Sequence, residues 1–156
     1  MKTIKRRRRE AKTDYRTRLV LLKSGKPRLV IRKTNRYIIA QIVVSDIAQD
    51  KVVVGLTSKI LLEKGWPREL SGSLKNLSAA YLTGFLLGKA AQKEKINSAI
   101  LDIGMNRNIP KSRLFSALRG AIDSGLKIPH KPESLPPMEM IKNEKVSKIF
   151  DKIIGG

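Results

Sequence analysis

The residues best suited to chemistry in this sequence are the arginines near its start. Lys5 is followed by four consecutive arginines, Arg6–Arg9, and basic residues continue as far as residue 36. A guanidinium group pairs two phosphate oxygens at once and stacks on flat rings. Of the 33 Lys and Arg residues, 15 lie in residues 1–36, together with only two of the 13 acidic residues. This pattern indicates recognition of a polyanion.

The whole chain carries a formal charge of +20, which opposes compact folding unless a polyanion neutralises it. Two other readings of the basic run are a solvated tail or localisation signal, and a membrane-binding surface. The first is disfavoured because the basic residues continue into predicted strands. The second needs an apolar helix face opposite the charges, and the single Trp lies far away at position 66. Nucleic acid is the favoured partner.

Membrane and secretory segments are not predicted. The longest uncharged apolar stretch is Leu77–Gly88, whereas a membrane span needs about 20 residues. No apolar segment follows the basic N-terminus, as a secretory signal would require. We therefore expect a cytoplasmic protein with no membrane partner.

Enzymatic chemistry has little support. The absence of cysteine excludes disulfides, zinc fingers and thiol catalysis, and the single histidine, His130, is predicted to pack in a proline-rich loop. The segment Ser24–Pro27 lacks the second glycine and the Ser/Thr of a phosphate-binding loop, so it predicts a helix stop. We expect no enzyme activity, no cofactor, no metal and no small-molecule substrate. A metallonuclease remains an alternative, and its candidate carboxylates are Asp46, Asp50, Asp102 and Asp123.

The predicted elements give an α/β fold with a mixed sheet packed with helices. Residues 1–12 are predicted to form a flexible basic arm that becomes ordered on its partner. Residues 13–136 are predicted to form a single α/β domain, and residues 137–156 an amphipathic tail helix. Runs of Val and Ile bounded by turn residues predict strands, and N-cap residues followed by apolar periodicity predict helices. The expected strands are Arg28–Lys33, Tyr37–Val44, Lys51–Thr57 and Ser98–Ile103. The expected helices are residues 13–24, capped by Thr13, and residues 76–95. Two further helices are expected to begin at the caps Ser58 and Ser112, the first of them short.

The candidate RNA-binding residues lie in the arm, the first helix and the first hairpin. The arm and helix supply charge, the hairpin tip at Thr34–Arg36 supplies a second wall, and two tyrosines could stack on bases. The set is Lys5, Arg6, Arg7, Arg8, Arg9, Lys12, Tyr15, Arg16, Arg18, Lys23, Lys26, Arg28, Arg32, Lys33, Asn35, Arg36 and Tyr37.

Blocks of sequence in order along the chain resemble a ribosomal family. They are Arg6-Arg7-Arg8-Arg9-Glu10, Thr13-Asp14-Tyr15-Arg16, Leu22–Leu29, Ala40-Gln41, Ser78–Gly84, Leu101–Gly104 and Gly125–His130. Together these blocks resemble the large-subunit ribosomal protein eighteen family, which is called number five in eukaryotes. The Ser78–Gly84 and Ile128–His130 blocks, with the chain length, are similar to its archaeal branch.

The resemblance implies a fold related to the ribonuclease-H-like group, of the translational machinery component type. It also implies binding to 5S rRNA, attachment of that RNA to the large subunit at the central protuberance, and contact with the large-subunit rRNA and neighbouring large-subunit ribosomal proteins. A non-ribosomal basic RNA chaperone or assembly factor remains an alternative.

Overall fold

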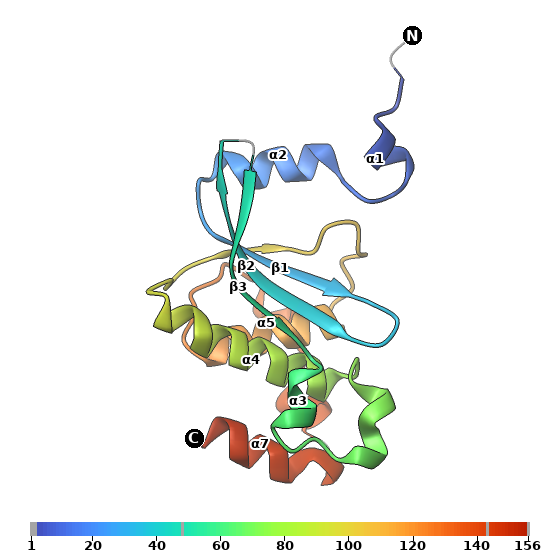
Figure 1. Ribbon diagram of the computed structural model, residues 1–156, viewed down its shortest axis with the longest axis vertical. Helices are drawn as coiled ribbons and strands as arrows, with labels where there is room; N and C mark the ends of the chain where they lie inside the picture. Colours follow the sequence, from blue (N-terminus) through green and yellow to red (C-terminus); the bar gives the residue numbers. More distant parts are fainter. Residues whose placement is uncertain (1–2, 48, 143, 156) are drawn as a thin grey trace.

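Within residues 3–47, 49–142 and 144–155, which the computed structural model describes, a four-stranded mixed sheet forms the centre of the fold (Figure 1). The strand order is β3-β2-β1-β4. The antiparallel strands β1, β2 and β3 follow one another along the chain, and β4 returns parallel to β1. The bounds are β1 Arg28–Lys33, β2 Ile38–Asp46, β3 Gln49–Thr57 and β4 Ile100–Asp102. This arrangement confirms the predicted α/β class with a mixed sheet.

The second hairpin differs from the prediction. A loop was expected from Ser45 to Asp50, but β2 and β3 continue pairing through Asp46 and Gln49. The Ser45 hydroxyl donates to an Asp50 carboxylate oxygen across the two strands at 2.6 Å. Polar residues that suggested a loop are therefore cross-strand partners at the end of a long hairpin.

Helices α4 (Leu77–Lys93) and α5 (Arg113–Asp123) cover one face of the sheet (Figure 1). The Asn76 side chain caps α4 as predicted, accepting from the Ala79 N–H at 2.7 Å. Gly84 of α4 lies so close to α5 that a Cβ there would overlap the Ala117 carbonyl oxygen. The apolar residues of β1 and β2 and the facing residues of α4 and α5 form the main core. Most residues of α4 are buried.

A second apolar cluster lies on the other side of α4. It is enclosed by α3 (Ile60–Glu63), the 3₁₀ helices η1 (Arg68–Ser73) and η3 (Glu144–Val146), and helices α6 (Met138–Ile141) and α7 (Ser147–Ile154). Trp66 is buried here, with its indole N–H donating to the Leu70 carbonyl. The cluster fixes the C-terminal part of the chain against the domain.

The C-terminal segment and Ser58 depart from the sequence interpretation. One amphipathic helix was expected after Pro137, whereas the structure divides this segment into α6, η3 and α7, leaving out residue 143. Ser58 does not cap α3. Its buried hydroxyl accepts from the Ile38 N–H at the start of β2, so the sheet uses this side chain instead. A further short 3₁₀ turn, η2, spans Pro132–Ser134.

Two basic helices lie at one end of the molecule (Figure 1). They are α1 (Arg6–Arg9) and α2 (Tyr15–Lys23), and neither contains a buried residue. Residues 1 and 2 of the predicted arm and residues 143 and 156 of the predicted tail lie outside the described part of the chain. Among the helices that are described, none combines the length and apolar character needed to cross a membrane.

Candidate nucleic-acid interface

The arginines of α1 project from the surface with few strong partners. All four are exposed. Arg6 and Arg8 approach Glu10 and Asp14 only at 3.8 and 3.7 Å, and exposed pairs of this kind contribute roughly 0–1 kcal/mol. No ion pair is described for Arg9 within residues 3–47, 49–142 and 144–155. The helix therefore presents its charge to solvent, where phosphate groups can reach it.

Asp14 fixes the start of α2 and replaces the predicted cap, Thr13. One Asp14 carboxylate oxygen accepts from the N–H groups of Arg16 and Thr17, at 3.1 and 3.4 Å. The hydrogen bond from the Thr17 N–H is the largest influence on Asp14 and lowers the pKa of its carboxyl group. Thr13 instead accepts from the Arg7 side chain at 3.0 Å, which connects α1 to the start of α2.

The exposed side of α2 carries both charge and an aromatic ring. Arg16 and Lys23 are exposed, as is Lys26 just after the helix, and Tyr15 is 37% exposed. The Lys5 ammonium lies 4.7 Å from the centre of the Tyr15 ring. This pair offers a flat ring and a cation together, which is an arrangement that binds an unstacked base next to a phosphate.

Arg28 is a correction to the predicted set. It is only 2% exposed, and its guanidinium pairs with Asp102 at 2.8 Å and with Asp50 at 2.9 Å. It also donates to the Ser45 hydroxyl at 2.9 Å. Because the side chain is buried and its hydrogen bonds are taken by protein, Arg28 cannot meet RNA phosphate. The arginine has a structural role at the centre of the sheet.

Arg32 and Arg18 are held by the same carboxylates. Arg32 donates to the Asp102 backbone carbonyl at 2.7 Å and to its side chain at 2.9 Å, yet its side chain stays 38% exposed. Arg18 binds Asp50 at 2.8 Å and so ties α2 to the β2–β3 hairpin. Both arginines have fixed positions and retain exposed surface beside α1 and α2.

Asp50 is held in its charged form. Burial raises its pKa, but the hydrogen bonds from Ser45, Arg18 and Arg28 outweigh that effect and lower the pKa to about 2. The carboxylate is therefore ionised at neutral pH and remains available to hold both arginines. Its charge positions α2 against the sheet.

The tip of the first hairpin presents Lys33, Asn35 and Arg36 to solvent, as the sequence predicted. The Tyr37 N–H donates to the Thr34 hydroxyl at 2.9 Å, which closes the turn. Tyr37 differs from the expectation, because its side chain is partly buried and packs on the second apolar cluster. Tyr15 is consequently the better placed of the two tyrosines for stacking.

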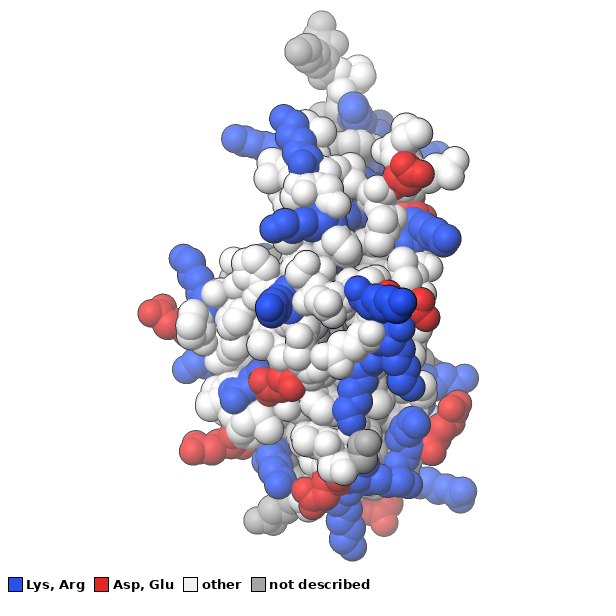
Figure 2. All heavy atoms as spheres, turned by 90° about the vertical axis from the view of Figure 1, so that its left-hand side faces the viewer, with Lys and Arg blue, Asp and Glu red and all other residues white. Residues whose placement is uncertain are grey.

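A small cavity of about 170 Å³ lies where α1, α2 and the sheet meet. The cations that line it include Arg7, Lys12, Arg18 and Arg32. On the face shown in Figure 2, Lys and Arg side chains outnumber Asp and Glu and extend from the N-terminal end down the molecule. The structure therefore brings the predicted arm and first-helix residues together with Arg32.

Three of the four carboxylates considered for a nuclease, those of Asp50, Asp102 and Asp123, are occupied by other groups. Asp102 is held by Arg28 and Arg32, and Asp50 by Arg18 and Arg28. Asp123 accepts from the Tyr81 hydroxyl at 2.9 Å, and burial together with this hydrogen bond raises the pKa of Tyr81. Across the described ranges no group of three or more His, Asp or Glu side chains could hold a metal ion. This geometry gives the metallonuclease alternative no support.

Sequence reasoning missed the segment that joins β4 to α5. It contains Arg107 and Lys111 and leads into Arg113, the first residue of α5. All three are exposed, and the segment directly follows Asp102. The available signal was three cations within seven residues, at positions 107–113, next to Gly, Asn and Pro residues. These residues are far from the N-terminal charge in sequence, but Met105 in this loop lies 3.4 Å from an Arg8 nitrogen.

Comparison with known proteins agrees with this geometry. Residues 1–98 and 90–131 match the family model described as ribosomal large subunit proteins 60S L5 and 50S L18. The chain belongs to this family. It is 48% identical over 148 residues to the large ribosomal subunit protein uL18 of Korarchaeum cryptofilum, covering 95% of this chain and 74% of that protein.

Two further archaeal relatives have the same name. The uL18 of Methanothermobacter thermautotrophicus is 44% identical over 148 residues, which is 95% of this chain and 75% of the relative. That of Methanospirillum hungatei is 46% identical over 143 residues, covering 92% and 79%. The family resemblance and its archaeal type are confirmed.

Proposed function

We propose that this protein binds 5S rRNA and attaches it to the large ribosomal subunit in the central protuberance, while also contacting the large-subunit rRNA. Membership in a family of large-subunit ribosomal proteins makes it a structural, non-enzymatic constituent of that subunit, located in the cytoplasm within the ribosome. Its partners are therefore rRNA and neighbouring large-subunit proteins. The finer assignment to 5S rRNA rests on the family resemblance and on the basic surface.

The observation that carries the proposal is the exposed, weakly paired cluster Arg6–Arg9 beside Tyr15 and Lys5. The A-form major groove of RNA is too narrow for side chains to read, so proteins bind phosphates, 2′-hydroxyls and unstacked bases. A cluster of guanidinium groups suits contact with phosphates, and an exposed tyrosine suits contact with an unstacked base. Aromatic residues make up only 4% of the chain. The contact is accordingly dominated by the RNA backbone and its shape.

The parts of the chain have different proposed roles. The arm of residues 1–12 supplies backbone contacts, the domain of residues 13–136 positions α2 and the hairpin tip, and residues 137–156 complete the second apolar cluster. Exposed side chains of α7 and the residues around it then face neighbouring ribosomal proteins. This division assigns RNA binding to one end of the molecule and protein contacts to the other.

The test is binding of the protein to archaeal 5S rRNA over a range of salt concentrations. If six to ten phosphates are neutralised, the affinity falls roughly 10³–10⁵-fold between 50 and 200 mM salt. A folded RNA of equal length serves as the control and should bind more weakly at every salt concentration. Equal affinity for both RNAs would contradict specific 5S rRNA binding. A flat salt profile would contradict the electrostatic mechanism.

A second measurement separates a ribosomal constituent from a transient RNA chaperone. The tagged protein is expressed in an archaeal host, and large subunits are washed at high salt before sedimentation. A constituent stays with the large subunits in a one-to-one ratio, whereas an assembly factor is released or is found only on precursor particles.

A further inference from the structure

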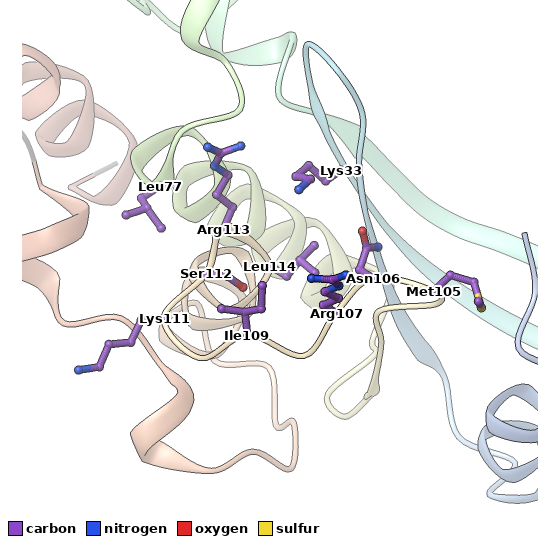
Figure 3. A pocket seen from close by; sticks show the side chains of 10 residues that line it. All are labelled: Lys33, Leu77, Met105, Asn106, Arg107, Ile109, Lys111, Ser112, Arg113 and Leu114. Atoms are coloured by element: carbon purple, nitrogen blue, oxygen red, sulfur yellow. The ribbon is translucent and has the colours of Figure 1, made fainter. Parts of the chain in front are cut away.

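A separate cavity of about 580 Å³ lies between the end of β1 and the start of α5. Figure 3 shows the side chains that line it, which come from β1, from the first residue of α4, from the loop that joins β4 to α5, and from the first two residues of α5. Its cations are Lys33, Arg107, Lys111 and Arg113, and no acidic residue lines it. The cavity is therefore a positively charged hollow outside the surface formed by α1 and α2.

These cations have no protein partners that would neutralise them. In the described part of the chain, no ion pair or side-chain hydrogen bond is formed by Lys33, Arg107, Lys111 or Arg113. In Figure 3, Lys33 and Arg113 extend toward the same space and Arg107 lies beside it, whereas Lys111 points away. Like charges gathered without a counter-ion favour binding of an anion.

The first turn of α5 adds donors to the cavity. Ser112 stands at the N-cap position but makes no capping hydrogen bond, and its hydroxyl is buried without a partner among the described residues. The first N–H groups of a helix have no acceptor within the helix. They carry the positive end of the helix dipole, which favours a bound phosphate. Ser112, Arg113 and Leu114 all line the cavity.

The cavity is connected to the N-terminal basic surface through the loop after β4. Met105 lines it and lies 3.4 Å from an Arg8 nitrogen. One residue earlier, Gly104 adopts a φ of +59° and donates its N–H to Asp102 at 2.9 Å, beside the Arg32 guanidinium. A Cβ at Gly104 would come within 2.8 Å of the Arg32 guanidinium carbon, so glycine permits this close approach. The loop that lines the cavity is thus in contact with α1.

We propose that this cavity binds a phosphate of the RNA backbone, with Arg107, Arg113 and Lys33 as its cationic donors and the first turn of α5 as its N–H donors. The inference rests on the proposed RNA-binding function and extends it to a second contact site. The phosphate belongs either to 5S rRNA or to the large-subunit rRNA. Both RNAs present the same phosphodiester chemistry.

The experiment compares a double variant, Arg107→Gln with Arg113→Gln, against a matched control, Lys127→Gln with Lys131→Gln. Both variants lose two positive charges, but the control lysines, Lys127 and Lys131, are exposed residues outside the lining of the cavity. Binding is measured to archaeal 5S rRNA and, separately, to large-subunit rRNA. Thermal unfolding of each variant confirms that it is folded.

Loss of two phosphate contacts should weaken binding to one of the RNAs roughly 10- to 100-fold and reduce the salt slope by about two. The RNA that responds identifies the source of the phosphate. The control pair should change the affinity and the salt slope far less. If the double variant and the control bind both RNAs equally well, the cavity site is overturned.

A further variant distinguishes failure of the cavity site from failure of the proposed function. An arm variant, Arg6–Arg9→Gln, is measured in parallel. If the arm variant loses affinity while the cavity variant does not, only the cavity site is excluded. If the wild-type protein fails to prefer 5S rRNA over a folded RNA of equal length, the 5S assignment itself fails.

Discussion

Arg28 and Asp102 form a buried ion pair across β1 and β4, with 2.8 Å between a guanidinium nitrogen and a carboxylate oxygen. The two side chains are only 3% and 8% exposed. Asp102 also accepts from Arg32, and Arg28 also binds Asp50, which in turn binds Arg18 of α2. One network therefore joins the parallel strand pair, the second hairpin and the basic helix.

Substituting Arg28 should affect folding and leave RNA contact unchanged. Arg28→Met removes the partner of a buried carboxylate, and breaking a buried pair in this way typically destabilises by about 3–5 kcal/mol. Because Arg32 still binds Asp102, we expect the lower end of that range. The measurement is chemical denaturation, followed by 5S rRNA binding at a temperature where the variant remains folded.

Arg36→Met is the matched control for Arg28→Met, since it removes the same charge from the exposed hairpin tip. Its stability should stay within about 0.5 kcal/mol of wild type, and its RNA affinity should fall. Should folded Arg28→Met lose more RNA affinity than Arg36→Met, the structural role given to Arg28 would be wrong.

The sheet, the buried helix α4 and the exposed arm could be predicted because each has a strong local signal. Runs of Val and Ile indicate the strands, Asn76 marks the start of α4, and consecutive arginines cannot form a core. The role of Arg28 could not be predicted this way. Its carboxylate partners lie 22 and 74 residues along the chain, and only the fold brings them to it.

The cavity beside α5 escaped prediction for the same reason. Lys33 and Arg113 are 80 residues apart in sequence and meet only because β4 pairs with β1 and the loop after β4 returns beside it. The break in the C-terminal segment also depends on packing, since Ser78 of α4 donates to the Ile141 carbonyl at the end of α6. The ribonuclease-H-like relationship stays a prediction from family resemblance.

Gly84 should not tolerate a side chain of any size. In Gly84→Ala the new methyl group would overlap the Ala117 carbonyl oxygen of α5, so the two helices must separate. Overpacking of this kind costs about 1–3 kcal/mol, and Gly84→Leu should be worse. Thermal unfolding measures the effect. Gly72→Ala is the control, because no atom lies within 4 Å of its new methyl position. Equal melting temperatures for Gly84→Ala and Gly72→Ala would show that the helices are not in close contact.

Asp50 should make the free energy of unfolding depend on pH in the acidic range. Its pKa is lowered in the folded protein to about 2 from an ordinary value of 3.8. The associated stability is therefore fully present above about pH 4 and is lost as the pH falls toward 2. Because the side chain is 32% exposed, we expect on the order of 1 kcal/mol after solvent screening.

Asp50→Asn tests this contribution. Free energies of unfolding are measured between pH 2 and 6 for the variant and for wild type. The difference between the two proteins should be largest near pH 6 and shrink as the pH falls. A difference that stays constant over the whole range would exclude Asp50 as the titrating group.

Removing the α1 arginines should separate RNA binding from folding. In Arg6–Arg9→Ala, no buried contact is lost and the repulsion among clustered charges is relieved, so the melting temperature should be unchanged or higher. Affinity for 5S rRNA should fall strongly, and the salt slope should drop by roughly one for each phosphate contact removed.

The control removes four exposed lysines from the opposite part of the molecule, Lys59, Lys64, Lys93 and Lys148, each replaced by alanine. It has the same net charge as the α1 variant, so a difference in affinity between the two reports position instead of total charge. We expect the control to keep most of its affinity for 5S rRNA. If the α1 variant melts early, α1 contributes to folding; if it binds 5S rRNA as tightly as the lysine control, the arm is not the RNA contact.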